Sequence, residues 1–246
     1  MLAVLLPLIA FFTALLSGIF GMAGGMVLMG ALVLLLPISA AFVTHGIIQI
    51  VSNGWRAWLN RADIVWSIIG WYALAALIAA LIFTGLAFVP PRPVVFIALG
   101  LVGLSVWLPA KRFALDARRP FHAFASGLLV TGTNLVAGVA GPLLDIFFVR
   151  TTLTRHQIVA TKAFTQVFAH LAKIIVYGGA MIFAADSETL PWIAILLAIP
   201  VTMLGTRTGK AVLDKMSDAI FLGWTRWIVS LIGLIYLARG LMLAMA

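Results

Sequence analysis

The chain contains two short glycine-rich stretches that lie 117 residues apart, Gly21-Met22-Ala23-Gly24-Gly25 and Gly138-Val139-Ala140-Gly141-Pro142. Each stretch interrupts a mostly apolar segment, 2–36 in the first case and 120–153 in the second. Both segments exceed the length of about 20 residues that one ordinary membrane span requires. Because glycine adopts backbone conformations that other residues avoid, we predict that the helix is broken at each stretch.

A half-helix is expected to begin after each break, near Met26 and near Leu143. The first N–H groups of a helix have no intrahelical partner, and they carry the positive end of the helix dipole. Such an end inside the membrane is an anion site. Close helix packing by small residues is the structural alternative. We predict that Gly24, Gly25 and Gly141 contribute to substrate binding.

The composition is that of a membrane protein. Of the 246 residues, 64% are hydrophobic and 9% are charged, and the mean hydropathy is +1.19. These values exclude an ordinary soluble domain and predict an all-α polytopic protein in the lipid bilayer. The absence of cysteine excludes disulfides and thiolate metal sites. The net charge of +9 fits the cytoplasmic bias of membrane loops, and without a basic soluble module no nucleic-acid partner is expected.

The apolar segments fall into two halves of the same order, each consisting of one hairpin and three helices. A basic linker at 111–119 separates a first repeat at 1–110 from a second repeat at 120–246. The predicted elements are the hairpin 2–36 and the helices 39–59, 64–89 and 93–109 in the first repeat, and the hairpin 120–153 and the helices 155–183, 190–209 and 222–244 in the second.

Loop charge distinguishes hairpins from full crossings in the two long segments. If both are hairpins, the basic loops share one face, and the opposite face holds Arg92, the turn Asp186-Ser187-Glu188 and both termini. If both cross fully, this asymmetry is lost. The positive-inside rule therefore favours hairpins, with a cytoplasmic linker and both termini on the periplasmic side. The basic loops of the shared face are Arg61, 111–119, Arg150 with Arg155, and 207–226.

Each half then contains one hairpin and three crossings. Because this number of crossings is odd, the second half is inserted upside down relative to the first. Inverted repeats whose broken helices meet near the midplane are a common plan for secondary transporters. The predicted fold is therefore two inverted repeats, each with a broken hairpin before three transmembrane helices.

The helix after each break carries a polar stripe. Its main members are spaced i, i+4, i+8 and i+11, which places them on one helical face. Polar groups at membrane depth must face protein or water, so a substrate pathway is favoured. The alternative is hydrogen bonding between helices, worth about 1 kcal/mol or less per contact. The stripes, which align at the same 117-residue shift, are Thr44, His45, Gln49, Asn53 and Arg56, and Thr161, Lys162, Gln166, His170 and Lys173.

The residue types in the stripes indicate the charge of the substrate. The stripes contain three cations and several amide donors but no carboxylate, which suits a small oxyanion. Arg56 and Lys173 could instead extend toward the membrane surface from near the helix ends. Lys162 and the two glutamines are therefore the stronger candidates. Asn134, which precedes the second break, is a further predicted binding residue.

Three residues are candidates for proton coupling. His45 and His170 titrate near neutral pH in an ordinary environment, although a lone histidine is more often a hydrogen-bonding partner. Asp145 follows the second break and is predicted to lie in the membrane. It could cap its half-helix, carry a proton or pair with Lys162 or Lys173, and pairing is the default interpretation. Thr202 and Thr206 are interpreted as packing residues or part of a cytoplasmic helix end.

Patterns typical of enzymes are missing from the sequence. It has no histidine pair at i, i+4, no Gly-x-Ser-x-Gly elbow and no Gly-x-x-x-x-Gly-Lys phosphate loop. The loops between the apolar segments are too short for a nucleotide-binding domain. We therefore expect a protein that is not an enzyme and that uses no metal and no cofactor.

Several motifs resemble one known family. They are the segment Ser17-Gly-Ile-Phe-Gly-Met-Ala-Gly-Gly, its counterpart Asn134-Leu-Val-Ala-Gly-Val-Ala-Gly-Pro, and the Thr-x-x-x-x-Gln pairs Thr44/Gln49 and Thr161/Gln166. The chain resembles the TauE/SafE sulfite exporter family, also called the toluene-sulfonate uptake permease family, over nearly its whole length. The resemblance implies multi-pass transport of sulfite, sulfonates or related sulfur-containing anions across the bacterial inner membrane.

The leading hypothesis is a secondary transporter that exports sulfite or an organosulfonate by movement between its two halves, with protons as a candidate coupling ion. A passive anion channel, an uptake permease for a sulfonate or organic acid, and a non-transporting membrane scaffold are the alternatives. The expected partners are a small anionic substrate and the bilayer. Both a monomer and a homodimer are compatible with the sequence.

Overall fold

A computed structural model describes residues 1–21, 23–113, 115–183, 189–216 and 218–245. Met22, Ala114 and the predicted acidic turn 186–188 lie outside the described residues. The α-helices are α1 (Leu2–Phe20), α2 (Ala23–Leu35), α3 (Ile38–Leu59), α4 (Trp66–Leu86), α5 (Arg92–Leu104), α6 (Pro120–Ala137), α7 (Gly141–Phe148), α8 (Arg155–Phe183), α9 (Trp192–Leu213) and α10 (Asp218–Met245). The described residues include three short 3-10 helices: η1 (Arg61–Asp63) between α3 and α4, and η2 (Ser105–Trp107) and η3 (Ala110–Phe113) between α5 and α6.

The helices have the length and composition of a membrane protein, which confirms the predicted all-α polytopic class. Among the described residues, five helices are long and apolar enough to cross a membrane: α1, α4, α8, α9 and α10. α3 has 22 residues and thus a comparable length, but it contains one of the two polar stripes. No strand occurs in the described part of the chain.

Both glycine-rich stretches contain a helix break. α1 ends before Gly21, which has φ 68°, and α6 ends before Gly138, which has φ 79°. α2 begins three residues before the expected Met26, and α7 begins two residues before the expected Leu143. The breaks are therefore shorter than predicted, and the later glycines of each stretch belong to the following helix.

The first turn of α2 can form early because it packs directly on α1. A Cβ atom added at Gly24 would lie 2.5 Å from Ser17 Oγ and 2.7 Å from Ser17 N. Only glycine allows this approach of the two helices. Gly24 and Gly25 are buried within α2 instead of lying in the break. The start of α7 has a different basis, because Pro142 occupies the first turn, where its fixed φ is already helical.

The helices pack in four close pairs: α1 with α9, α4 with α6, α3 with α8, and α5 with α10. Small residues line the α1–α9 contact, where a Cβ atom added at Gly18 would lie 2.7 Å from Gly209 Cα. The α5–α10 contact is similar, because a Cβ atom added at Gly103 would lie 2.8 Å from Gly233 Cα. Such contacts bring helix backbones together in membranes.

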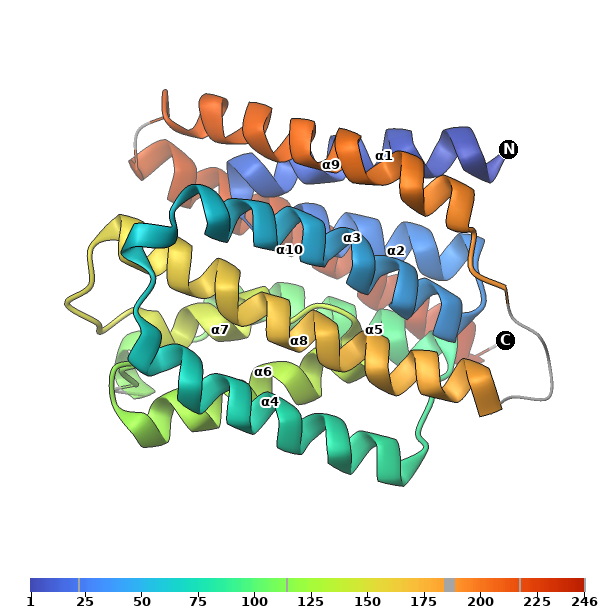
Figure 1. The fold of residues 1–246 in the computed structure, drawn as a ribbon, viewed down its shortest axis with the longest axis horizontal. Helices are drawn as coiled ribbons and strands as arrows, with labels where there is room; N and C mark the ends of the chain where they lie inside the picture. Colours follow the sequence, from blue (N-terminus) through green and yellow to red (C-terminus); the bar gives the residue numbers. More distant parts are fainter. Residues whose placement is uncertain (22, 114, 184–188, 217, 246) are drawn as a thin grey trace.

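The turns are distributed unequally between the two ends of the bundle. Figure 1 shows both chain termini at the same end. The η1 turn, the central linker and the α7–α8 and α9–α10 connections lie at the other end. The linker is folded against the bundle, because Ala117 N donates to Phe147 O at 2.8 Å. Hydrogen bonds from Arg118 lower the pKa of Asp116 in this linker.

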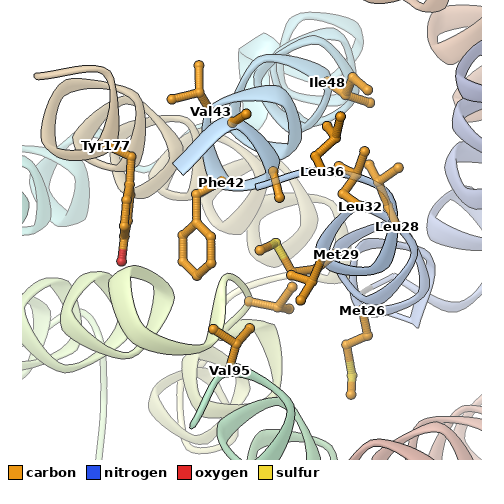
Figure 2. Close-up of a cluster of buried hydrophobic side chains, with 14 of the residues drawn as sticks. Met26, Leu28, Met29, Leu32, Leu36, Phe42, Val43, Ile48, Val95 and Tyr177 are labelled. Atoms are coloured by element: carbon orange, nitrogen blue, oxygen red, sulfur yellow. The ribbon is translucent and has the colours of Figure 1, made fainter. Parts of the chain in front are cut away.

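The largest apolar core joins α2 to α3, α5 and α8, as Figure 2 shows. The rings of Phe42 and Tyr177 lie 4.3 Å apart, and the Tyr177 hydroxyl donates to Leu135 O in α6. The side chain of Met29 packs against Gly138, within the second break. The core therefore fixes α2, which follows the first break, directly against the second break.

Candidate functional site

The two polar stripes meet because α3 and α8 pack in opposite directions. A Cβ atom added at Gly46, early in α3, would lie 3.2 Å from His170 O, late in α8. The pairing of His45 with Lys173 has the same register. The stripes thus lie along one antiparallel contact at the centre of the bundle (Figure 1).

His45 connects the first turn of α2 to α8. Its Nε2 lies 3.0 Å from Gly25 O, and its Nδ1 lies 3.0 Å from Lys173 Nζ. Because a carbonyl oxygen only accepts, Nε2 carries the hydrogen and Nδ1 is the acceptor. Lys173 therefore donates to His45. The ring of His170 lies 5.5 Å from that of His45 and is also buried.

Lys173 connects this pair to the second break. Its ammonium group donates to Gly138 O at 2.5 Å and lies 5.5 Å from the centre of the Phe42 ring. The side chain has 0% exposure, so it does not extend to the membrane surface. No described carboxylate forms an ion pair with it. A buried cation without a described counter-charge thus connects Gly138 in the second break, directly, to Gly25 in the first turn of α2, through His45.

Arg56 and Lys162 lie toward the opposite end of the α3–α8 contact. Arg56 Nη2 donates to Ser17 O at 2.9 Å, in the last turn of α1. Lys162 forms an ion pair with Asp145 of α7, which is one of the two pairings expected for that carboxylate. The two cations therefore contact the helices on either side of the breaks, Arg56 at α1 and Lys162 at α7.

The two glutamines differ in their environment. Gln49 Oε1 accepts from Asn53 Nδ2 at 3.3 Å, which fixes the amide and leaves Nε2 as a donor. This Nε2 faces the first turn of α2, because a Cβ atom added at Gly25 would lie 2.7 Å from it. Gln166 is half-buried, and its side chain makes no hydrogen bond among the described residues.

Other predicted residues are separated from this cluster or lack partners. Thr161 Oγ1 accepts from Val65 N at 3.0 Å and thereby holds the start of α4. The structure therefore gives Thr161 a contact unlike that of the other stripe residues. Thr44 is fully buried, and its hydroxyl has no partner in the described part of the chain. Asn134 is also fully buried, and both atoms of its amide lack a described partner. Gly141 is the first residue of α7.

The structure also brings together hydroxyl groups that the sequence analysis did not assign to a site. Ser52 Oγ lies 3.0 Å from Thr206 Oγ1, and Thr202 lies one turn earlier on α9. Thr13 and Ser17 provide a similar pair on α1. The signal in the sequence was the i, i+4 spacing of hydroxyl residues within apolar helices, which places both members on one face.

A narrow pocket lies among these groups, between α1, α2, α3 and α9. No gap within it is wide enough for a water molecule. Among the described residues, no group of histidines and acids is arranged to hold a metal ion. The polar residues that line the pocket are Thr13, Ser17, Gln49, Ser52 and Thr202.

Comparison with known proteins gives one match. The family model described as "Sulfite exporter TauE/SafE" matches residues 6–238. The chain matches no curated protein and no solved structure.

Proposed function

Because this chain belongs to the sulfite exporter TauE/SafE family, we propose that it is a secondary transporter that exports sulfite or a related sulfur-containing anion. The observation that carries the proposal is the cluster of buried donors at the two helix breaks. Lys173 is a fully buried cation without a described carboxylate partner. An unpaired buried charge is unfavourable, and an anionic substrate would supply the missing counter-charge.

The other donors surround the same junction. Gln49 directs its free Nε2 toward the start of α2, where backbone N–H groups and the helix dipole favour an anion. Gln166 and the start of α7 are the proposed counterparts in the second half. Lys162 is paired with Asp145 in this closed arrangement, so its charge becomes available to an anion when that pair opens.

His45 is the proposed proton carrier. A proton bound at Nδ1 would occupy the position that accepts from Lys173 in this structure and would place two positive charges in contact. The His45–Lys173 link between the two breaks would then open. Proton binding is therefore proposed to favour separation of α3 from α8.

The packing of the helices supports the proposed inverted repeats. The 117-residue shift relates α1 to α6, and the order of the elements relates α9 to α4. The contact of α1 with α9 is therefore the counterpart of the contact of α6 with α4. α3 with α8 and α5 with α10 are pairs of equivalent helices. This reciprocity is expected of two copies related by a two-fold axis.

The position of the turns supports the proposed orientation. The linker 111–119 contains four basic residues, the η1 turn contains Arg61 and the α7–α8 connection contains Arg150, and these segments lie together at one end of the bundle (Figure 1). Positive-inside bias favours the cytoplasm for this end of a bacterial inner-membrane protein. Both termini would then be periplasmic.

The closed pocket favours a carrier over a permanently open channel, because no gap in it admits water. Purified protein in liposomes separates the two, with sulfite flux measured against pH and voltage gradients. A carrier by alternating access gives saturable flux, and proton coupling makes that flux depend on the pH gradient. Flux that never saturates would identify a channel.

Sulfite is expected to raise the melting temperature of the purified protein. A concentration of about 100 times the Kd adds about 2.7 kcal/mol of stability, or roughly 5–10 °C at this chain length. Lys162→Ala is expected to abolish the shift, because it removes a cation of the binding cluster. Differential scanning fluorimetry measures both.

Lys210→Ala is the matched control for that experiment. Lys210 is an exposed lysine whose carboxylate partner, Asp214, lies 2.8 Å away at i+4. Its removal should leave the sulfite shift intact. If the wild-type protein shows no shift with sulfite or with any sulfonate, the proposed function is wrong.

Gly25→Ala is expected to weaken sulfite binding about tenfold, because the added methyl group would displace Gln49 Nε2 and cost one charge-assisted hydrogen bond. Isothermal titration measures the Kd. Gly70→Ala is the control, since no heavy atom lies within 4 Å of a Cβ atom added there. Equal affinities of Gly25→Ala and the wild type for sulfite would show that Gln49 does not contribute to binding.

A further inference from the structure

The pocket between α1, α2, α3 and α9 contains donors that the protein itself does not use. Thr202 lines this pocket with 0% exposure, and its hydroxyl has no partner in the described part of the chain. A buried hydroxyl without a partner destabilises the folded protein. Because no gap in the pocket admits water, water does not satisfy this group in the closed arrangement.

Ser52 and Gln49 line the same space. Ser52 Oγ lies 3.0 Å from Thr206 Oγ1, and such a pair uses only one of its two O–H groups. When Thr206 donates to Ser52, the Ser52 O–H remains free to donate into the pocket. Gln49 Nε2 is the third donor, because Asn53 holds the amide oxygen. Three donors therefore converge from α3 and α9, and a sulfite or sulfonate group carries three acceptor oxygens.

The charges around the pocket indicate an anion instead of a cation. No carboxylate lines it. The carbonyl oxygen of Ser17, which a cation would use, already accepts from the guanidinium group of Arg56 at 2.9 Å. The first turn of α2, which contains Gly24, packs on Ser17 and places a positive helix end nearby. A cation would therefore meet positive charge here.

The second half has other residues at two of these pocket positions. The 117-residue shift carries Thr13 to Val130 and Ser52 to Ala169. Apolar side chains at these positions cannot donate hydrogen bonds. The two halves therefore differ in chemistry, although their packing is reciprocal.

We propose that this pocket is a subsite that binds the oxygens of the sulfite or sulfonate group. The proposal rests on the proposed function. Thr202 and Ser52 are its specificity-determining donors, with Gln49. The subsite opens when the α2–α3 wall separates from the α1–α9 wall, and the bound anion then satisfies the Thr202 hydroxyl.

Thr202→Val tests the proposal in the purified full chain. Valine keeps the shape and removes an unpaired hydroxyl, so the melting temperature without ligand should stay the same or rise. The Kd for sulfite, measured by isothermal titration, should increase about tenfold, the loss of one hydrogen bond to a charged group. Ser52→Ala should weaken binding similarly, and Thr202→Ser should retain nearly wild-type affinity.

Thr131→Val is the matched control, because Thr131 is a fully buried threonine of α6 that does not line the pocket. Its Kd should equal that of the wild type, and an equal loss at Thr131 would overturn the proposal. Wild-type affinity in both Thr202→Val and Ser52→Ala would overturn the subsite and leave the proposed function standing. If the wild-type protein binds neither sulfite nor sulfonates, both the subsite and the proposed function are wrong.

A sodium arm separates anion from cation binding. The melting temperature is compared in sodium chloride and potassium chloride without sulfite. If each protein, wild type and Thr202→Val, has the same melting temperature in the two salts, the anion subsite is supported. A sodium-specific increase that Thr202→Val abolishes would show a cation site and overturn the proposal.

Discussion

Lys173→Met is expected to reduce sulfite flux in liposomes at least about 100-fold while leaving the protein folded. Lys173 is the cation that contacts Gly138 O in the second break and, through His45 Nδ1, the start of α2. Loss of a buried charge from a binding site typically costs about 2–5 kcal/mol, and about 2.8 kcal/mol corresponds to 100-fold. Methionine has a similar length and shape but no donor and no charge.

The stability of Lys173→Met should change little, because two effects oppose each other. Removing a desolvated cation that has no counter-charge is favourable by several kcal/mol. Leaving Gly138 O and His45 Nδ1 without their donor costs about 1–3 kcal/mol each. Thermal unfolding measures the difference, and Lys210→Met at the surface is the control for expression and reconstitution. Flux near the wild-type value would remove Lys173 from the transport site.

Gly138→Ala is expected to destabilise the protein by about 3 kcal/mol or more, for two additive reasons. Gly138 has φ 79°, a conformation that costs other residues about 1–2 kcal/mol. An added Cβ atom would also lie 2.6 Å from Met29 Cγ, and such overpacking costs about 1–3 kcal/mol. The melting temperature should fall by roughly 6–12 °C.

Two other glycines separate these contributions. Gly21 has φ 68°, but no heavy atom lies within 4 Å of a Cβ atom added there. Gly21→Ala should therefore show the conformational cost alone. Gly179→Ala, within α8 and also without a close neighbour, should be neutral or stabilise by about 0.5–1 kcal/mol. Equal losses in Gly138→Ala and Gly21→Ala would show that contact with Met29 contributes nothing.

Much of the helical framework could be predicted from local sequence patterns. The apolar composition predicts the all-α membrane class, and Gly21 and Gly138 both occur at helix ends with positive φ. The start of α2 could not be predicted as well, because Gly24 is helical only where α1 lies against it. Long-range packing decides such boundaries.

The residues of the candidate site could be predicted from the sequence, but the contacts between them could not. The spacing of each stripe places its residues on one face, but it does not give the register of α3 against α8. In that register His45 contacts Lys173. Thr161 lies apart from this pair and accepts a hydrogen bond from Val65 N. Thr202 was missed as a binding candidate because one threonine in an apolar helix commonly packs against its neighbours.

The glycine contact between Gly18 and Gly209 leaves almost no space between the α1 and α9 backbones. If one helix slid past the other, their main chains would collide, so the two helices are expected to move together as one rigid pair. One helix of this pair comes from each half of the chain, and the same is true of the pair formed by α4 and α6. Each rigid pair that moves in the transport cycle would therefore contain helices from both halves, and neither half of the chain would form a complete rigid unit by itself.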